Sequence, residues 1–146
     1  MSVYSEVLKF KKKYSGTLAF RLRSHCEVLE SHLNPDEKLL YVFAGQKNYR
    51  SIALPNTFVV ALTNKRLLFA RKRLLFGYFF YAVTPDMFND LKVNSGIIWG
   101  KIMIDTVKEL AVINNIDKEA LSEIETMITE YMMKEKKKYA LRKDSK

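Results

Sequence analysis

The sequence contains little of the material from which metal sites, disulfide frameworks and catalytic centres are built. Its 146 residues include one cysteine and two histidines, so no intramolecular disulfide can form and a metal site has few candidate ligands. No glycine-rich phosphate-binding loop is present, and no nucleophile has an evident base nearby. We therefore expect no metal, no cofactor and no enzymatic activity, and a reducing compartment is the default.

Glycine and proline are also scarce, with five and three residues, which excludes collagen-like and low-complexity chains. No apolar run reaches the roughly 18 residues of a membrane-spanning helix, and residues 1–13 lack the apolar stretch of a signal peptide. A composition of 48% hydrophobic and 28% charged residues is typical of one globular domain. We expect a cytoplasmic protein, with peripheral association with the membrane left open.

The net charge of +9 is unevenly distributed. Residues 34–83 contain eight Lys or Arg and two Asp or Glu, so this third of the chain carries two thirds of the net positive charge. A basic surface attracts phospholipid head groups, nucleic acid and acidic protein surfaces alike, because its field depends on charge density and not on the partner.

The first 35 residues are expected to form one or two helices that precede the main domain. Apolar residues recur at three- to four-residue steps from Val3 to Tyr14 and again from Leu18 to Leu33, with a break at Gly16. Asn34-Pro35 ends the second stretch, since the residue before a proline avoids the helical conformation.

From Lys38 onward the pattern changes to short apolar runs separated by turn residues, which indicates consecutive antiparallel strands. The polar turn Thr63-Asn64-Lys65-Arg66 predicts a hairpin between the second and third strands. Seven strands at this spacing are typical of a small barrel or sandwich. The expected strands are residues 39–44, 56–62, 67–70, 74–83, 88–93, 97–104 and 107–113.

The last segment returns to a helical pattern. Asn115 or Asp117 can cap this helix, and an apolar stripe runs from Leu121 to Tyr131. Beyond Met133 the stripe is lost, and residues 134–146 are predicted to fray into a basic tail.

Strands followed by one amphipathic helix are the element order of pleckstrin-homology-like barrels. Residues 59–69, which contain the Thr-Asn-Lys-Arg turn, resemble a strand, turn and strand of the bacterial pleckstrin-homology-like domain family of the YokE-like kind. Residues 96–104 are similar to its glycine-bounded fifth-to-sixth strand region. The resemblance covers residues 36–133. It implies an α+β fold, a PH-like antiparallel β-barrel of about seven strands capped by the C-terminal helix.

The resemblance further implies a noncatalytic interaction module, although fold similarity alone does not assign an activity. Eukaryotic relatives include phosphoinositide binders whose basic signature lies in the loop between the first two strands. Here that loop, residues 45–55, offers only Lys47 and Arg50. No phosphoinositide site is therefore carried over.

The densest basic group is the candidate site for an anion or a partner. Each exposed cation near an anionic membrane contributes about 1 kcal/mol of attraction. However, neighbouring side chains on a strand point to opposite faces, which opposes a single patch, and solvated strand ends are the favoured interpretation. The candidate residues are Lys65, Arg66, Arg71, Lys72 and Arg73, with Lys47 and Arg50 as weaker members.

Residues 74–81 carry five aromatic side chains in eight positions. If exposed, this run would be a partner or membrane surface. Burial beneath the N-terminal helices is favoured, because most aromatic runs in strands are packed, and the same holds for Trp99.

Two histidines and the cysteine lie on the second predicted helix. His25 and His32 are seven residues apart, on nearly one face, but no third ligand is visible nearby. Cys26 belongs to the apolar stripe, so we expect a buried structural thiol.

Three binding modes fit these features. A protein partner, which includes self-association, is favoured over an anionic lipid surface, and both are favoured over nucleic acid bound through the basic β-hairpin. No small-molecule substrate is identified.

Overall fold

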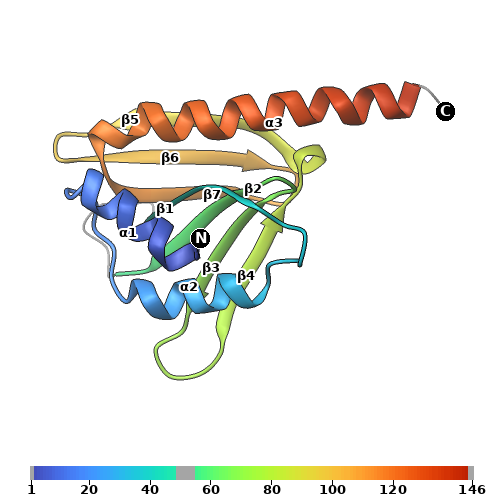
Figure 1. Ribbon diagram of the computed structural model, residues 1–146. Helices are drawn as coiled ribbons and strands as arrows, with labels where there is room; N and C mark the ends of the chain where they lie inside the picture. The colour runs from blue at the N-terminus through green and yellow to red at the C-terminus, as the bar shows by residue number, and fades with distance from the viewer. Residues whose placement is uncertain (1, 49–54, 145–146) are drawn as a thin grey trace.

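The computed structural model describes residues 2–48 and 55–144 and shows seven antiparallel strands in one curled sheet (Figure 1). The order is β4-β3-β2-β1-β7-β6-β5, and among the described residues no pairing joins β4 to β5, so the sheet is a half-barrel. This confirms the PH-like fold class. The strands are β1 (Leu39–Gln46), β2 (Thr57–Thr63), β3 (Leu67–Lys72), β4 (Tyr78–Val83), β5 (Phe88–Ser95), β6 (Trp99–Thr106) and β7 (Leu110–Asp117).

In the described part of the chain, three α-helices flank the sheet, α1 (Val3–Lys13), α2 (Leu22–Ser31) and α3 (Leu121–Asp144), with two short 3-10 turns, η1 (Pro85–Met87) and η2 (Lys118–Ala120). Ser2 caps α1, because its hydroxyl accepts a hydrogen bond from the Ser5 amide at 3.0 Å. Asp117 caps the turn that leads into α3 in the same way, through the Glu119 amide.

The N-terminal helices are docked on the outer face of the sheet. Apolar side chains of α1 and α2, among them Val7 and Leu29, form one buried cluster with Val59 and Leu68 of β2 and β3. Residues 3–31 therefore cover strands that would otherwise expose an apolar face.

A second, larger cluster fills the inner face of the half-barrel. Phe43, Phe69 and Ile102 lie at its centre, and α3 closes it with a buried stripe that includes Ile124 and Ile128. Strand β2 contributes alternate residues to both clusters and is buried throughout. This double burial explains its continuous apolar sequence.

Several of the expected element boundaries are wrong. The apolar run from Leu74 does not begin a strand, since β4 starts at Tyr78. The C-terminal helix does not fray at Met133 but continues to Asp144 and extends past the sheet (Figure 1). Lysine, glutamate and alanine favour helix even without an apolar stripe, and Lys138 pairs with Glu135 one turn earlier at 3.1 Å. Within the described residues, no helix has the length and apolar character needed to cross a membrane.

Gly45 lies at the junction between the two halves of the sheet, next to the pairing of Gln46 in β1 with Asn114 in β7. A Cβ at Gly45 would lie 2.6 Å from Ile113 Cγ2 and 2.9 Å from the Asn114 carbonyl oxygen. We expect Gly45→Ala to lower the free energy of unfolding by about 1–3 kcal/mol in urea titrations, because overpacking strains a filled core. Ser122→Ala, on an exposed position of α3, is the control and should change it by less than about 0.5 kcal/mol. A Gly45→Ala protein as stable as wild type would contradict this packing.

Candidate functional site

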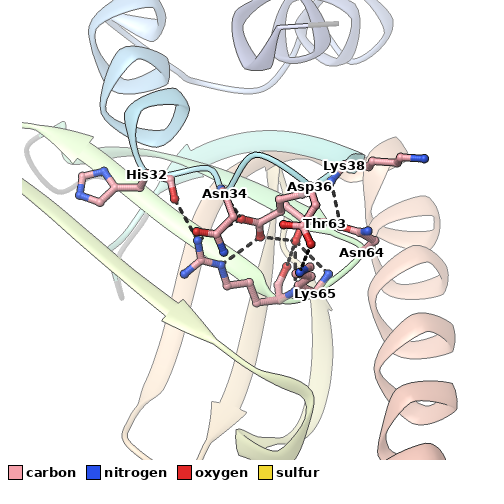
Figure 2. A network of polar contacts seen from close by, with 9 residues as sticks. His32, Asn34, Asp36, Lys38, Thr63, Asn64 and Lys65 are labelled. Atoms are coloured by element: carbon pink, nitrogen blue, oxygen red, sulfur yellow. Dashed lines mark hydrogen bonds and ion pairs between the residues drawn. The ribbon is translucent and has the colours of Figure 1, made fainter.

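The Thr-Asn-Lys-Arg turn between β2 and β3 is locked onto the segment that follows α2 (Figure 2). The Thr63 hydroxyl donates to Glu37 at 2.6 Å and accepts from the amides of Lys65 and Arg66, each at 3.1 Å. The Asn64 side chain accepts from the Lys38 amide at 2.8 Å. The turn that carries the family resemblance therefore has a structural task.

Arg66 and Lys65 are both engaged in this lock. The Arg66 guanidinium binds both carboxylate oxygens of Glu37 at 3.0 Å and donates to the His32 carbonyl. Burial alone would raise the pKa of Glu37, but the hydrogen bonds from Arg66 and Thr63 outweigh it and lower that pKa from its usual value. Lys65 pairs with Asp36 at 2.5 Å on the surface. Both candidate cations therefore have a carboxylate partner in this structure.

The weaker members of the predicted basic set lie elsewhere. Lys47 pairs with Glu109 at 3.3 Å, and its ammonium lies over the rings of Tyr81 and Phe58 at 4.8 and 5.5 Å. Its charge is thus balanced by a carboxylate and two aromatic faces. Arg50 lies outside the described residues.

The loop between β3 and β4 exposes three consecutive apolar side chains. Leu74, Leu75 and Phe76 are 75%, 80% and 83% exposed, and Figure 1 shows this loop projecting beyond α2 and away from the sheet. Gly77 adopts φ of +75°, a conformation that glycine tolerates, and its carbonyl accepts the Arg73 amide to close the loop. We call Leu74, Leu75 and Phe76 the hairpin tip, and the prediction that they are buried is wrong.

Beyond the hairpin tip, the side chains of β4 become progressively less exposed to solvent. Tyr78 and Phe79 are about half exposed, whereas Phe80 is partly covered by the His32 ring, stacked at 4.0 Å. Tyr81 stacks on Phe69 at 4.5 Å inside the half-barrel. The expected packing of the aromatic run therefore holds for its last two residues, and Trp99 is partly buried.

Cations surround the base of the hairpin tip. Arg71 and Lys72 alternate between the two faces of β3, as expected, but both lie at the strand end, next to Arg73 in the loop. Arg21, which sequence reasoning did not select, joins them, because its guanidinium donates to the Lys72 carbonyl at 3.3 Å. We call Arg21, Arg71, Lys72 and Arg73 the basic collar.

The cations of the basic collar contact neutral groups, among them the Thr57 carbonyl for Arg71 and the Phe79 ring for Arg73. Within residues 2–48 and 55–144, none of its four members has an ion pair with a carboxylate. Burial, followed by the neighbouring charge of Arg21, lowers the pKa of Arg71 from its ordinary value. The remaining candidates, Lys65 and Arg66, lie at the opposite end of β3, so the predicted basic group is divided in two.

His25 holds α2 against the base of the hairpin. Its Nδ1 accepts a hydrogen bond from the Lys72 amide at 2.8 Å. Burial, followed by the charges of Arg71 and Arg21, lowers the pKa of His25 to about 4, so the ring is neutral at neutral pH. Burial, with the nearby charges of Glu30 and Glu27, raises the pKa of the Cys26 thiol to about 12, which fits the expected structural role.

The two histidines are not brought together. His32 stacks on Phe80, and its Nδ1 lies 2.7 Å from the Val28 carbonyl oxygen, whereas His25 contacts β3. In the part of the chain that the structure describes, no three His, Cys, Asp or Glu side chains are grouped so as to hold a metal ion. What the surface offers chemically is a combination of apolar contact and positive charge.

The sequence model of the bacterial PH domain family matches residues 33–130 of the chain. A crystal structure of a pleckstrin homology domain from Shewanella amazonensis SB2B aligns with 14% sequence identity and a TM-score of 0.49, covering 84% of this chain and 98% of that one. Comparison with the curated proteins returns no match. The family match spans all seven strands and the first part of α3.

The Arg66–Glu37 contact predicts a large difference between two neighbouring cations. Because the Glu37 side chain is fully buried, we expect Arg66→Met to lower the free energy of unfolding by about 2–4 kcal/mol, as a buried carboxylate loses its cation. Lys65→Met removes an exposed pair and should cost less than about 1 kcal/mol. Urea denaturation of both variants at neutral pH measures this difference. Equal losses in the free energy of unfolding would contradict a structural role for the Arg66–Glu37 contact drawn in Figure 2.

Because the pKa of His25 is lowered in the folded protein, we expect the protein to lose stability in mild acid. Its folded-state pKa lies below its ordinary value of 6.5, so the unfolded chain takes up the proton first and stability falls as the pH drops from 6.5 towards 4. Between pH 7 and pH 5 the wild type should lose about 1–2 kcal/mol more than His25→Asn, which cannot titrate but keeps an acceptor near Nδ1. Identical pH profiles from denaturant titrations would disprove this assignment.

Proposed function

The chain belongs to the bacterial PH domain family, and from this premise we propose that it binds the surface of an anionic membrane through the hairpin tip and the basic collar. The family as a whole supports a noncatalytic interaction module. The observation that carries the choice of a membrane is the placement of three largely exposed apolar side chains directly beyond four cations that have no carboxylate partner among the described residues.

The apolar part of the proposed contact is the hairpin tip. Leu74, Leu75 and Phe76 contribute nothing to either buried cluster, so their apolar surface is surplus to folding. A projecting loop can enter a fluid bilayer without a shaped pocket, because lipid chains rearrange around it. Aromatic and aliphatic side chains at this depth gain hydrophobic free energy in proportion to the area removed from water.

The charged part is the basic collar. On a sheet face, the alternation of Arg71 and Lys72 would separate their charges. Approached end-on along the hairpin, however, both faces of β3 lie at the same depth, and Arg73 and Arg21 complete the ring. Cations at the level of the head groups and apolar residues beyond them match the layering of an anionic leaflet.

A protein or a nucleic acid fits this arrangement less well. A protein partner would have to supply a pocket that fits the isolated hairpin tip. Among the described residues, the further exposed apolar side chains at this end of the hairpin are Phe20, Tyr78 and Phe79, each about half exposed. Nucleic acid would use the cations and stacked aromatics, but the two leucines at the tip offer it no stacking surface.

Removal of charge from the basic collar tests the electrostatic part. We expect Lys72→Gln/Arg73→Gln to weaken binding to phosphatidylglycerol-containing vesicles about 30-fold in co-sedimentation assays, because each cation contributes about 1 kcal/mol at such a surface. The matched control, Lys136→Gln/Lys137→Gln, removes the same charge from the far end of α3 and should bind like the wild type.

The apolar part has its own variant in the same assay. Leu74→Ser/Leu75→Ser/Phe76→Ser should weaken binding by about 3 kcal/mol, or roughly 100-fold, while circular dichroism and thermal unfolding stay unchanged. Vesicle binding that tolerates both sets of substitutions would contradict the proposal. So would tighter, salt-sensitive binding to single-stranded RNA than to the vesicles.

A further inference from the structure

A second apolar projection lies at the turn between β5 and β6. Ile97 and Ile98 are 93% and 65% exposed, and neither belongs to a buried cluster. Turns at such positions normally carry polar residues. The sequence placed both isoleucines in a strand, but the structure begins β6 at Trp99 and leaves them at the apex.

This turn is held in place by polar contacts that leave the isoleucine side chains outward. The Gly96 amide donates to the Trp99 carbonyl at 2.9 Å across the base of the turn. Lys118 donates from its ammonium to the Ile97 carbonyl at 2.7 Å. The Trp99 indole donates to the Gly16 carbonyl at 3.1 Å. A preorganised turn loses little conformational entropy when it contacts a partner.

The α1–α2 connection links this turn to the hairpin base. From Gly16, which accepts the Trp99 indole, the chain continues to Phe20, whose amide donates to Thr57 at 3.1 Å, and to Arg21, which donates to Lys72. Phe20 is itself 47% exposed. In Figure 1 the β5–β6 turn lies at the left edge, the β3–β4 loop lies at the bottom, and this connection runs between them in the view.

We infer that Ile97 and Ile98 form a second anchor that enters the same anionic bilayer as the hairpin tip, with the α1–α2 connection lying along the head groups between them. This inference rests on the proposed function. A bilayer accommodates two separate apolar projections on one continuous surface, whereas a protein partner would need a complementary pocket for each. Lys118 is flanked by Asp117 and Glu119, so the second anchor supplies apolar contact and the basic collar supplies the charge.

The single tryptophan of the chain is a native reporter, because Trp99 directly follows the second anchor. The experiment adds wild-type protein to phosphatidylglycerol-containing vesicles whose acyl chains are either brominated or unmodified. Bromine quenches tryptophan fluorescence at short range, so entry of the turn into the acyl region should quench Trp99 with brominated lipid only. We expect a clear loss of emission for the wild type at saturating lipid.

The variant Ile97→Ser/Ile98→Ser should bind the vesicles about tenfold more weakly and lose the quenching at saturation. Its matched control, Val107→Ser/Leu110→Ser, removes exposed apolar side chains at the β6–β7 turn, at the other end of β6, and should keep both binding and quenching. Circular dichroism checks that each variant is folded.

The outcomes separate the two proposals. One outcome would overturn the second anchor and leave the proposed function intact. In it, vesicle binding depends on the basic collar, Trp99 of the wild type is not quenched, and Ile97→Ser/Ile98→Ser binds with unchanged affinity. Absence of any binding to the anionic vesicles would overturn both. Quenching in the wild type that persists in Ile97→Ser/Ile98→Ser at equal affinity would also overturn the second anchor.

Discussion

Burial of β2 on both faces is the constraint on which the arrangement of the molecule depends. Its alternate side chains fill the interior of the half-barrel and the layer beneath α1 and α2, so neither face tolerates water. The N-terminal helices are therefore part of the fold, because without them Val59 and Leu68 would be exposed. The Arg66–Glu37 lock then fixes the segment after α2 against the end of the same hairpin.

Once both clusters are filled, the remaining apolar residues are informative about binding. The hairpin tip and the two isoleucines of the β5–β6 turn lie beyond the cover provided by the helices. Exposed apolar residues lower solubility and contribute nothing to packing, and their adjacency in these two projections supports the proposed membrane contact. The basic collar, which has no carboxylate partner among the described residues, narrows the proposed partner to an anionic surface.

Much of the fold could be predicted from the sequence, because the relevant signals are local. Seven apolar runs, the Gly16 break and the stripe from Leu121 depend on spacing along a few residues, and each predicts an element that the structure contains. The apolar stripe alone underestimates the length of α3, because lysine and alanine still favour a helix after the stripe has ended.

The candidate site was harder to predict, because exposure and pairing depend on residues distant in sequence. Arg66 resembles any cation in a turn, and its neutralisation by Glu37 comes from a contact 29 positions away. Leu74 to Phe76 have the composition of a strand, and Gly77 was the one local sign of a turn. Arg21 reaches the hairpin only because α2 docks on β3. The fold therefore places the two parts of the predicted basic group at opposite ends of β3.

The most direct test of the central claim is the depth of the hairpin tip when the protein is on a membrane. A nitroxide attached through Leu75→Cys can be examined by electron paramagnetic resonance, since Cys26 is buried and its raised pKa keeps it unreactive. On phosphatidylglycerol-containing vesicles, the nitroxide should become accessible to oxygen and protected from a polar nickel complex. A bound protein whose nitroxide stayed as accessible to the nickel complex as in solution would contradict insertion of this loop.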